Sequence, residues 1–168
     1  MAVLVIAEHD NNILKTSTLN TITAATKLSD DIHLLILGKD IQTLSNNAKT
    51  IHPIKKILKC DNSKLENFIP ELSAPIISNI ASGYSHILAP ASTFGKNLLP
   101  RVSALLDVTQ ISDVIEIKSE NTFVRPIYAG NAISHVETNQ NINLLTIGPT
   151  SFEKCEETGG SASSEDVQ

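Results

Sequence analysis

The sequence contains no tryptophan and only two cysteines among its 168 residues. Cys60 and Cys155 lie far apart and belong to no CxxC pair or other set with the spacing of metal ligands. A disulfide between them is geometrically possible, but no framework of further cysteines surrounds it, and two reduced thiols in a reducing compartment are expected. Hydrophobic residues still make up 41% of the chain, which predicts a core of isoleucine, leucine, valine and alanine.

Long basic runs and long apolar runs are also missing. The formal net charge is −5, and no lysine or arginine run exceeds Lys55–Lys56. Because nucleic-acid binding needs a concentrated basic face, no nucleic-acid partner is expected. The first apolar run, residues 2–7, is too short for a signal sequence or a membrane span, and no basic segment precedes it. We therefore expect a soluble, intracellular protein, and Met1 leading directly into the first apolar run favours a bacterial cytoplasmic protein over a processed mitochondrial one.

Motifs of catalysis and metal binding are missing as well. Neither GxGxxG nor GxxxxGK[ST] occurs, and no two histidines have the i, i+4 spacing of a helical metal site. Ser85 and His86 are neighbours in sequence, whereas a nucleophile and its base must converge in space. Glu8 and Asp10 are interpreted as helix caps and solvated loop charges. The residues thus give no support for a catalytic triad or a metal site, and no catalytic residues are expected.

Through residue 108 the chain alternates between patterns of buried strands and helices. Continuous apolar runs, which are typical of strands covered on both faces, occur at residues 2–7, 32–37, 57–58 and 86–89. Apolar residues at helical spacing lie between them. The alternation predicts an α/β fold with a parallel sheet and right-handed crossovers. Lysines flank residues 57–58 and place that strand nearer an edge.

Capping residues and prolines indicate where the helices begin and bend. The polar segment that starts at Asp10 can cap the first helix. Ser73 can cap a later helix that tolerates Pro75 in its first turn. Pro100 falls inside the last helix of this region and predicts a kink or a break there.

After residue 111 the pattern changes to strand-like pieces separated by short turns, at residues 114–117, 122–129, 132–136 and 142–147. Short connections favour antiparallel hairpins. We therefore expect an antiparallel meander that extends or flanks the parallel sheet. Residues 1–150 are interpreted as one α/β domain.

From Glu153 the chain is polar and rich in small residues, and residues 158–164 read TGGSASS. This stretch is superficially similar to the SGGxDS phosphate loop of ATP pyrophosphatases, but that loop contains an aspartate and directly follows the first strand. A segment of this composition cannot bury enough surface to offset its ordering entropy. Residues 151–168 are interpreted as a flexible linker or tail.

Two polar loops that follow predicted strands are candidate anion sites, because ligands collect at the carboxyl ends of parallel strands. One loop comprises residues 7–12. The other comprises residues 90–96, where Ser92, Thr93 and Lys96 are possible phosphate contacts. Capping and loop closure are the alternative interpretation of both loops.

Arg125 lies within an otherwise apolar predicted strand. An arginine in such a place usually meets a carboxylate or carbonyl groups, or lies at an interface. One interpretation is an internal pair between Arg125 and Asp113. The other is a subunit or domain interface that also includes Arg101, Tyr128 and Asn131.

Several stretches, taken in order, resemble the amino-terminal domain of the electron-transfer flavoprotein alpha subunit. They are residues 4–9 (LVIAEH), 21–26 (TITAAT), 94–102 (FGKNLLPRV), 110–114 (QISDV) and 123–132 (FVRPIYAGNA). The resemblance runs over nearly the full chain. It implies a Rossmann-like three-layer fold with a mainly parallel sheet, related to the adenine nucleotide alpha hydrolases and universal stress proteins.

The resemblance also implies a function. In that family this domain pairs with a beta subunit, which holds AMP, while a second alpha domain makes most of the contacts with FAD. The heterodimer carries electrons from flavin dehydrogenases, such as the acyl-CoA dehydrogenases of fatty acid β-oxidation, to a quinone oxidoreductase. No residue of the flavin-binding domain has a counterpart here, so we expect a fragment that does not hold FAD firmly alone.

Two other functions stay open at this point. One is a nucleotide-binding or nucleotide-hydrolysing module of the universal stress protein type, which would use the loop at residues 90–96. The other is an adaptor domain that has neither a nucleotide nor a flavoprotein partner.

Overall fold

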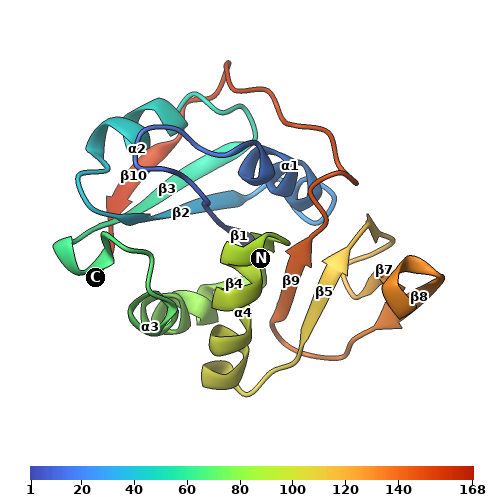
Figure 1. Ribbon diagram of the computed structural model, residues 1–168. Coiled ribbons are helices and arrows are strands. Elements are labelled where there is room, and N and C mark those ends of the chain that lie inside the picture. The colour runs from blue at the N-terminus through green and yellow to red at the C-terminus, as the bar shows by residue number, and fades with distance from the viewer.

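A computed structural model describes residues 1–168 as a seven-stranded sheet covered by helices on both faces, with a three-stranded sheet beside it (Figure 1). The strand order is β10-β3-β2-β1-β4-β9-β5, and every neighbouring pair is parallel. The predicted α/β fold with a parallel sheet is confirmed. The strands are β1 (Ala2–Ile6), β2 (Ile32–Gly38), β3 (Ile54–Asp61), β4 (Tyr84–Pro90), β5 (Gln110–Val114), β9 (Asn143–Ile147) and β10 (Ser163–Asp166).

Each face of the sheet has its own apolar core. α1 (Thr16–Ala25) and α2 (Gln42–Ala48) cover one face, and α3 (Pro70–Ile80) and α4 (Thr93–Leu106) cover the other. β1 contributes to both cores, because Val3 and Val5 point to the first and Leu4 and Ile6 to the second. A strand that is apolar on both faces must lie between two layers of helices, so β1 is central. Single 3-10 turns, η1 (Ser63–Leu65) and η2 (Ala81–Gly83), precede and follow α3.

The small sheet consists of β6 (Glu116–Ile117), β7 (Thr122–Ile127) and β8 (Ala132–Glu137), paired antiparallel. A 3-10 turn, η3 (Tyr128–Gly130), joins β7 to β8. The expected meander is confirmed for these strands but was wrong for residues 142–147. β9 lies parallel between β4 and β5. All five of its residues are buried, which suits a central strand covered on both faces rather than the edge of a hairpin.

The first helix begins several residues after the polar segment that was expected to cap it. α1 starts at Thr16, and Asp10 does not cap it. One Asp10 carboxylate oxygen instead accepts the backbone N–H groups of Asn12 and Ile13, both at 2.9 Å, and closes a turn in the loop before the helix. These bonds lower the pKa of the Asp10 carboxyl, since they favour its charged form.

Two proline expectations also need correction. α3 begins at Pro70 rather than after Ser73, since Pro70 suits the first helical position, where no N–H is needed. Pro75 therefore lies inside the helix, and Ser73 is a buried residue and not a cap. α4 runs as one helix through Pro100, which lies on its exposed side, so the predicted break does not occur.

The segment interpreted as a flexible tail contributes a strand. β10 pairs in parallel with β3 along the register Ser163–Lys56 to Asp166–Lys59. Figure 1 shows residues 148–162 crossing over the α1 and α2 side before β10 reaches the far edge of the sheet. The unpaired backbone groups of an edge strand favour such an addition, and local composition does not reveal it. Whether this segment leads to a further domain stays a prediction.

Backbone contacts fix the path of residues 156–162, here called the strap. The Gly160 N–H donates to the Thr50 carbonyl at 2.8 Å, and the Ala162 N–H donates to the Lys49 carbonyl at 3.0 Å. A Cβ on Gly160 would overlap the Ile51 carbonyl group. Gly159 has a φ of +89°, which favours glycine. The two glycines of TGGSASS therefore let the strap approach the α2–β3 connection closely.

None of the helices combines the length and apolar character needed to cross a membrane.

The strap gives the first prediction. The Gly160→Ala substitution should destabilise the chain by about 2 kcal/mol, because the added methyl group has to displace backbone rather than a flexible side chain. The measurement is urea unfolding followed by circular dichroism. Gly83→Ala is the matched control, since a Cβ at Gly83 meets nothing within 4 Å. Equal unfolding midpoints for the two variants would contradict the close approach.

Candidate functional site

The carboxyl ends of β1 and β4 meet at the point where the strand order reverses. The chain runs from β1 to β2 and β3 on one side, and then returns to place β4 on the other side of β1. Open α/β sheets bind their ligands at such a switch point. A cavity of about 320 Å³ opens here; its lining residues are Glu8, His9, Lys15, Phe68, Thr93, Phe94 and Asn97.

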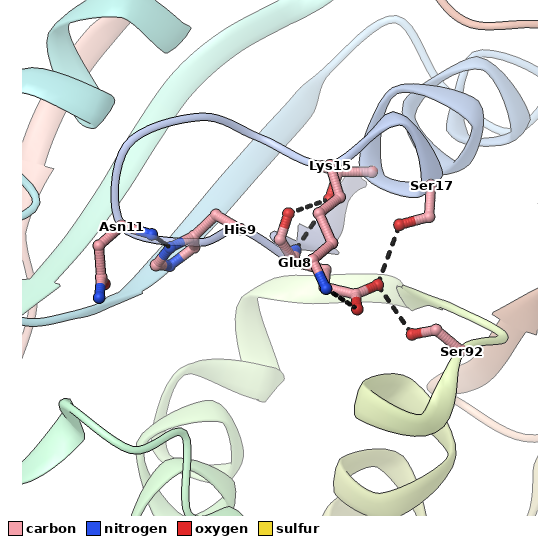
Figure 2. Close-up of polar contacts among 7 residues, drawn as sticks. Glu8, His9, Asn11, Lys15, Ser17 and Ser92 are labelled. Atoms are coloured by element: carbon pink, nitrogen blue, oxygen red, sulfur yellow. Dashed lines mark hydrogen bonds and ion pairs between the residues drawn. The ribbon is translucent and has the colours of Figure 1, made fainter.

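Glu8 occupies the centre of this switch point. One of its carboxylate oxygens, Oε2, accepts the hydroxyl of Ser17 at 2.9 Å and the hydroxyl of Ser92 at 2.8 Å. The other, Oε1, accepts the Lys15 ammonium at 3.2 Å. Figure 2 shows the three donors converging on this carboxylate from α1, the loop before it and the start of α4. The Glu8 residue is only 7% exposed, so its interpretation as a solvated loop charge was wrong.

The backbone of Glu8 is fixed as firmly as its side chain. Its N–H donates to the Thr18 hydroxyl oxygen at 2.8 Å, and the same hydroxyl donates back to the Glu8 carbonyl at 2.9 Å. The Lys15 N–H also donates to this carbonyl, at 2.9 Å. Thr18 is fully buried in α1. The first turn of α1 therefore holds the end of β1 in place.

His9 connects the loop after β1 to the end of β2. Its Nδ1 accepts the Asn11 N–H at 3.0 Å, which leaves Nε2 to donate to the Leu37 carbonyl at 2.9 Å. This arrangement requires the neutral ring. Burial lowers the pKa of His9. The Phe68 ring packs edge-on against the imidazole with 5.0 Å between ring centroids. His9 is thus a structural residue of the cavity wall.

The structure separates the three residues predicted as phosphate contacts. The Ser92 hydroxyl is bonded to Glu8, and Thr93 lines the cavity. Lys96 points elsewhere and forms a 2.8 Å ion pair with Asp113. The loop at residues 90–96 therefore presents no free cation to the cavity. Its main contact with the loop after β1 is the hydrogen bond from Ser92 to the Glu8 carboxylate.

Arg125 does not pair with Asp113, so that interpretation was wrong. Its Nε donates to the Ser112 carbonyl at 2.8 Å, and a terminal nitrogen donates to the Ser112 hydroxyl at 3.1 Å. Ser112 and Asp113 lie where the register of β5 shifts, and Asp113 has a φ of +56°. The shift turns the Ser112 carbonyl out of the ladder, and the guanidinium provides its partner. Arg125 thereby anchors the small sheet to β5.

The interface candidates do not form one surface. Arg101 lies on α4 and donates to a Glu71 oxygen of α3 at 2.6 Å. Tyr128 lies in the turn between β7 and β8 and is 80% exposed. Asn131 follows in the same turn, where its N–H donates to the Tyr128 carbonyl at 3.1 Å.

His86 is a second buried histidine with a structural role. Its Nε2 bonds to the Glu120 carbonyl at 2.7 Å, and its Nδ1 lies 2.8 Å from the Ser85 hydroxyl. The ring thus connects β4 to the turn between β6 and β7. Burial lowers the pKa of His86. The Ser85–His86 contact leads to no third group that could form a triad.

Neither a metal site nor a reactive thiol is built in this structure. No three His, Cys, Asp or Glu side chains come close enough to hold a metal ion. Cys60 and Cys155 are both free. Burial raises the pKa of Cys155 to about 11, which keeps its thiol protonated at neutral pH.

Glu8 lies in the candidate loop at residues 7–12, but sequence reasoning missed its central role, its donors Lys15 and Ser17, and the close approach at Gly160. The signal at Glu8 was available in part, since a carboxylate directly after a buried strand lies at a place where ligands gather. Nothing in the local sequence shows that Ser92, more than eighty positions away, donates to it.

The chain is similar to known proteins over nearly its whole length. The family described as the electron transfer flavoprotein domain matches residues 3–168. The chain is 46% identical over 167 residues to an electron transfer flavoprotein subunit alpha of Pseudomonas aeruginosa, covering 99% of this chain and 54% of that protein. A mitochondrial alpha subunit of Dictyostelium discoideum is 44% identical over 167 residues, covering 95% of this chain and 47% of that protein. The chain spans about half the length of the curated relatives it matches.

The buried histidines give the second prediction. His86 has a lowered pKa in the folded chain, whereas in the unfolded chain its pKa is about 6.5. The unfolded state therefore binds more protons as pH falls below about 7, so stability should decrease between about pH 7 and pH 5.5. One such histidine contributes a slope of at most about 1.4 kcal/mol per pH unit. The measurement is urea unfolding at a series of pH values.

The His86→Gln variant should show a shallower slope over this range, because it removes one of the two histidines, His9 and His86, whose burial lowers the pKa. His52→Gln, at an exposed position, is the control and should keep the slope of the unmodified chain. If His86→Gln and His52→Gln gave the same slope of unfolding free energy against pH, protonation of His86 would not contribute to the pH dependence, which would contradict the prediction.

Proposed function

This chain belongs to the electron transfer flavoprotein family, and from that membership we propose that it acts as the pairing domain of an alpha subunit. It would join a beta subunit in a heterodimer that carries electrons from flavin dehydrogenases, such as acyl-CoA dehydrogenases, to a quinone oxidoreductase. The observation that carries the proposal is the match to alpha subunits over nearly the whole of this chain. The domain itself is proposed to be an electron-carrier component and not a catalyst.

The side chains at the switch point do not suit the flavin dinucleotide that the family name implies. A dinucleotide needs free donors for its pyrophosphate at the switch point. Here the Ser17, Ser92 and Lys15 donors are bonded to the Glu8 carboxylate. We therefore propose that FAD is held by residues outside these 168, and that AMP belongs to the beta subunit.

The proposed compartment follows the named relatives. These include a bacterial alpha subunit and mitochondrial alpha subunits. We propose a bacterial cytoplasmic location, or the mitochondrial matrix if the source is a eukaryote.

The surface that best suits a partner subunit is the hairpin of β7 and β8 with its turn at residues 128–131, here called the arm. At its tip Tyr128 is 80% exposed, and Ile133 on β8 is 53% exposed. Tyr128, Ala129 and Gly130 all have positive φ values, of 50°, 53° and 89°. Such backbone is costly for non-glycine residues and is found where function requires it. Exposed tyrosines are frequent anchors of protein interfaces, so we propose that the arm contacts the beta subunit.

The base of the arm is rigid, which supports this role. Phe123 is fully buried against the core shared by α1 and the main sheet. Arg125 makes two hydrogen bonds to Ser112 at the register shift of β5. An arm that is ordered before binding loses less conformational entropy when it binds. Arg125 is therefore proposed to position the interface, and Tyr128 and Asn131 to lie in it.

The third prediction tests the pairing. When this chain is mixed with an electron transfer flavoprotein beta subunit from the same source, the two should co-elute in size-exclusion chromatography. Tyr128→Ser should weaken the association at least about tenfold, the loss expected for an aromatic anchor. The affinity is measured by titration calorimetry.

Leu105→Ala is the matched control, because Leu105 is 55% exposed but lies on α4, away from the arm. Its affinity should equal that of the unmodified chain. Absence of co-elution would contradict the pairing, whereas equal affinities of all three chains would contradict only the role of the arm. If the chain purified with stoichiometric flavin absorption, the assignment of FAD to other residues would be wrong.

A further inference from the structure

We propose that the Glu8 carboxylate is a built-in anion that fills an oxyanion position at the switch point, so that Glu8 makes this domain refractory to phosphate-bearing ligands. Phosphate and carboxylate are recognised by the same donors, namely ammonium, hydroxyl and backbone N–H groups. The side chain would thus take the place that a phosphate group would take. This inference goes beyond the pairing proposed above and does not depend on it.

The donors around Glu8 form a set that suits an oxyanion. Two hydroxyls converge on a single oxygen, with Ser17 at 2.9 Å and Ser92 at 2.8 Å. The Lys15 ammonium lies 3.2 Å from the second oxygen. Figure 2 shows that the three side chains surround the carboxylate from different directions. Such a set of donors binds a negatively charged group that has at least two oxygens.

The burial of Glu8 indicates that these donors are required. Its side chain is 9% exposed, whereas that of Lys15 is 54% exposed. A buried carboxylate is costly unless it is hydrogen-bonded and paired. Here two neutral hydroxyls and one cation together satisfy it. Removal of the carboxylate would leave the donors without an acceptor, beside a cavity of about 320 Å³ through which a small anion can enter.

The topology supports the assignment independently of the donors. Glu8 follows β1, and Ser92 follows β4, and these strands are neighbours at the reversal of the strand order. This is the place at which parallel α/β sheets bind ligands. The Thr18 hydroxyl holds the Glu8 backbone from both its N–H and its carbonyl. The side chain is therefore held at the switch point, where it excludes a competing anion.

The fourth prediction replaces the built-in anion with an external one. In Glu8→Ala, inorganic phosphate should restore the lost acceptor, so its addition should raise the thermal midpoint by about 3 °C more than in the unmodified chain. The measurement compares phosphate with chloride at equal ionic strength. Because phosphate also stabilises proteins generally through exclusion from their surface, only the difference from the unmodified chain counts.

Three further variants separate a specific site from a general effect. Glu71→Ala removes an exposed carboxylate that pairs with Arg101 and should respond to phosphate as the unmodified chain does. Glu8→Gln fills the same volume and should also show no extra response. In the Glu8→Ala background, Ser92→Ala should reduce the phosphate response at least about threefold, since a donor is lost.

Either folding outcome of Glu8→Ala decides the proposal. If the variant is folded, a phosphate response no larger than that of Glu71→Ala would overturn it. If the variant is unfolded in chloride, its circular dichroism should recover in phosphate, and failure to recover would overturn it equally. Neither result bears on co-elution with a beta subunit, so the two proposals fail separately.

Discussion

The buried carboxylate of Glu8 is the interaction on which the centre of this fold depends. It connects the end of β1 to the first turn of α1 through Ser17, and to the start of α4 through Ser92. These helices cover opposite faces of the sheet, so a single side chain joins both layers at the point where the strand order reverses. Because Glu8 is buried and its two hydroxyl donors are half-buried, the fold depends on these groups being satisfied together.

A parallel sheet imposes a second constraint, since its strands must be covered on both faces and its edges must be protected. The helices meet the first requirement. At one edge β10 protects the backbone of β3 by pairing with it. Glu165 and Asp166 of β10 also form ion pairs with Lys56 and Lys59 of β3. At the other edge β5 changes register, and Arg125 binds the carbonyl that the shift leaves free. Segments from late in the chain thus form one edge of the sheet and bind the free carbonyl at the other.

The sequence predicted the parts of the fold that local patterns encode. Apolar runs identified β1, β2 and β4, because residues buried on both faces must be apolar throughout. The misplaced elements depend on distant partners. The local sequence of β9 resembles a hairpin strand, and its place between β4 and β5 depends on the tertiary fold. β10 has a polar sequence and pairs only with the edge of β3, so its local pattern does not predict a strand. At the site, Glu8 was visible as a residue after a strand, but the hydrogen bond that Ser92 donates to it depends on the tertiary fold.

The fold alone therefore says little about what the domain binds, since function depends on the site that a fold carries. Here the ligand position of the α/β architecture is used for internal bonding, and its donors face a carboxylate of the same chain. The proposed recognition surface lies elsewhere, on the arm, where Tyr128 is exposed and Arg125 is bonded to Ser112. In the proposed pairing, a partner on the arm would leave the bonds of the Glu8 carboxylate unchanged.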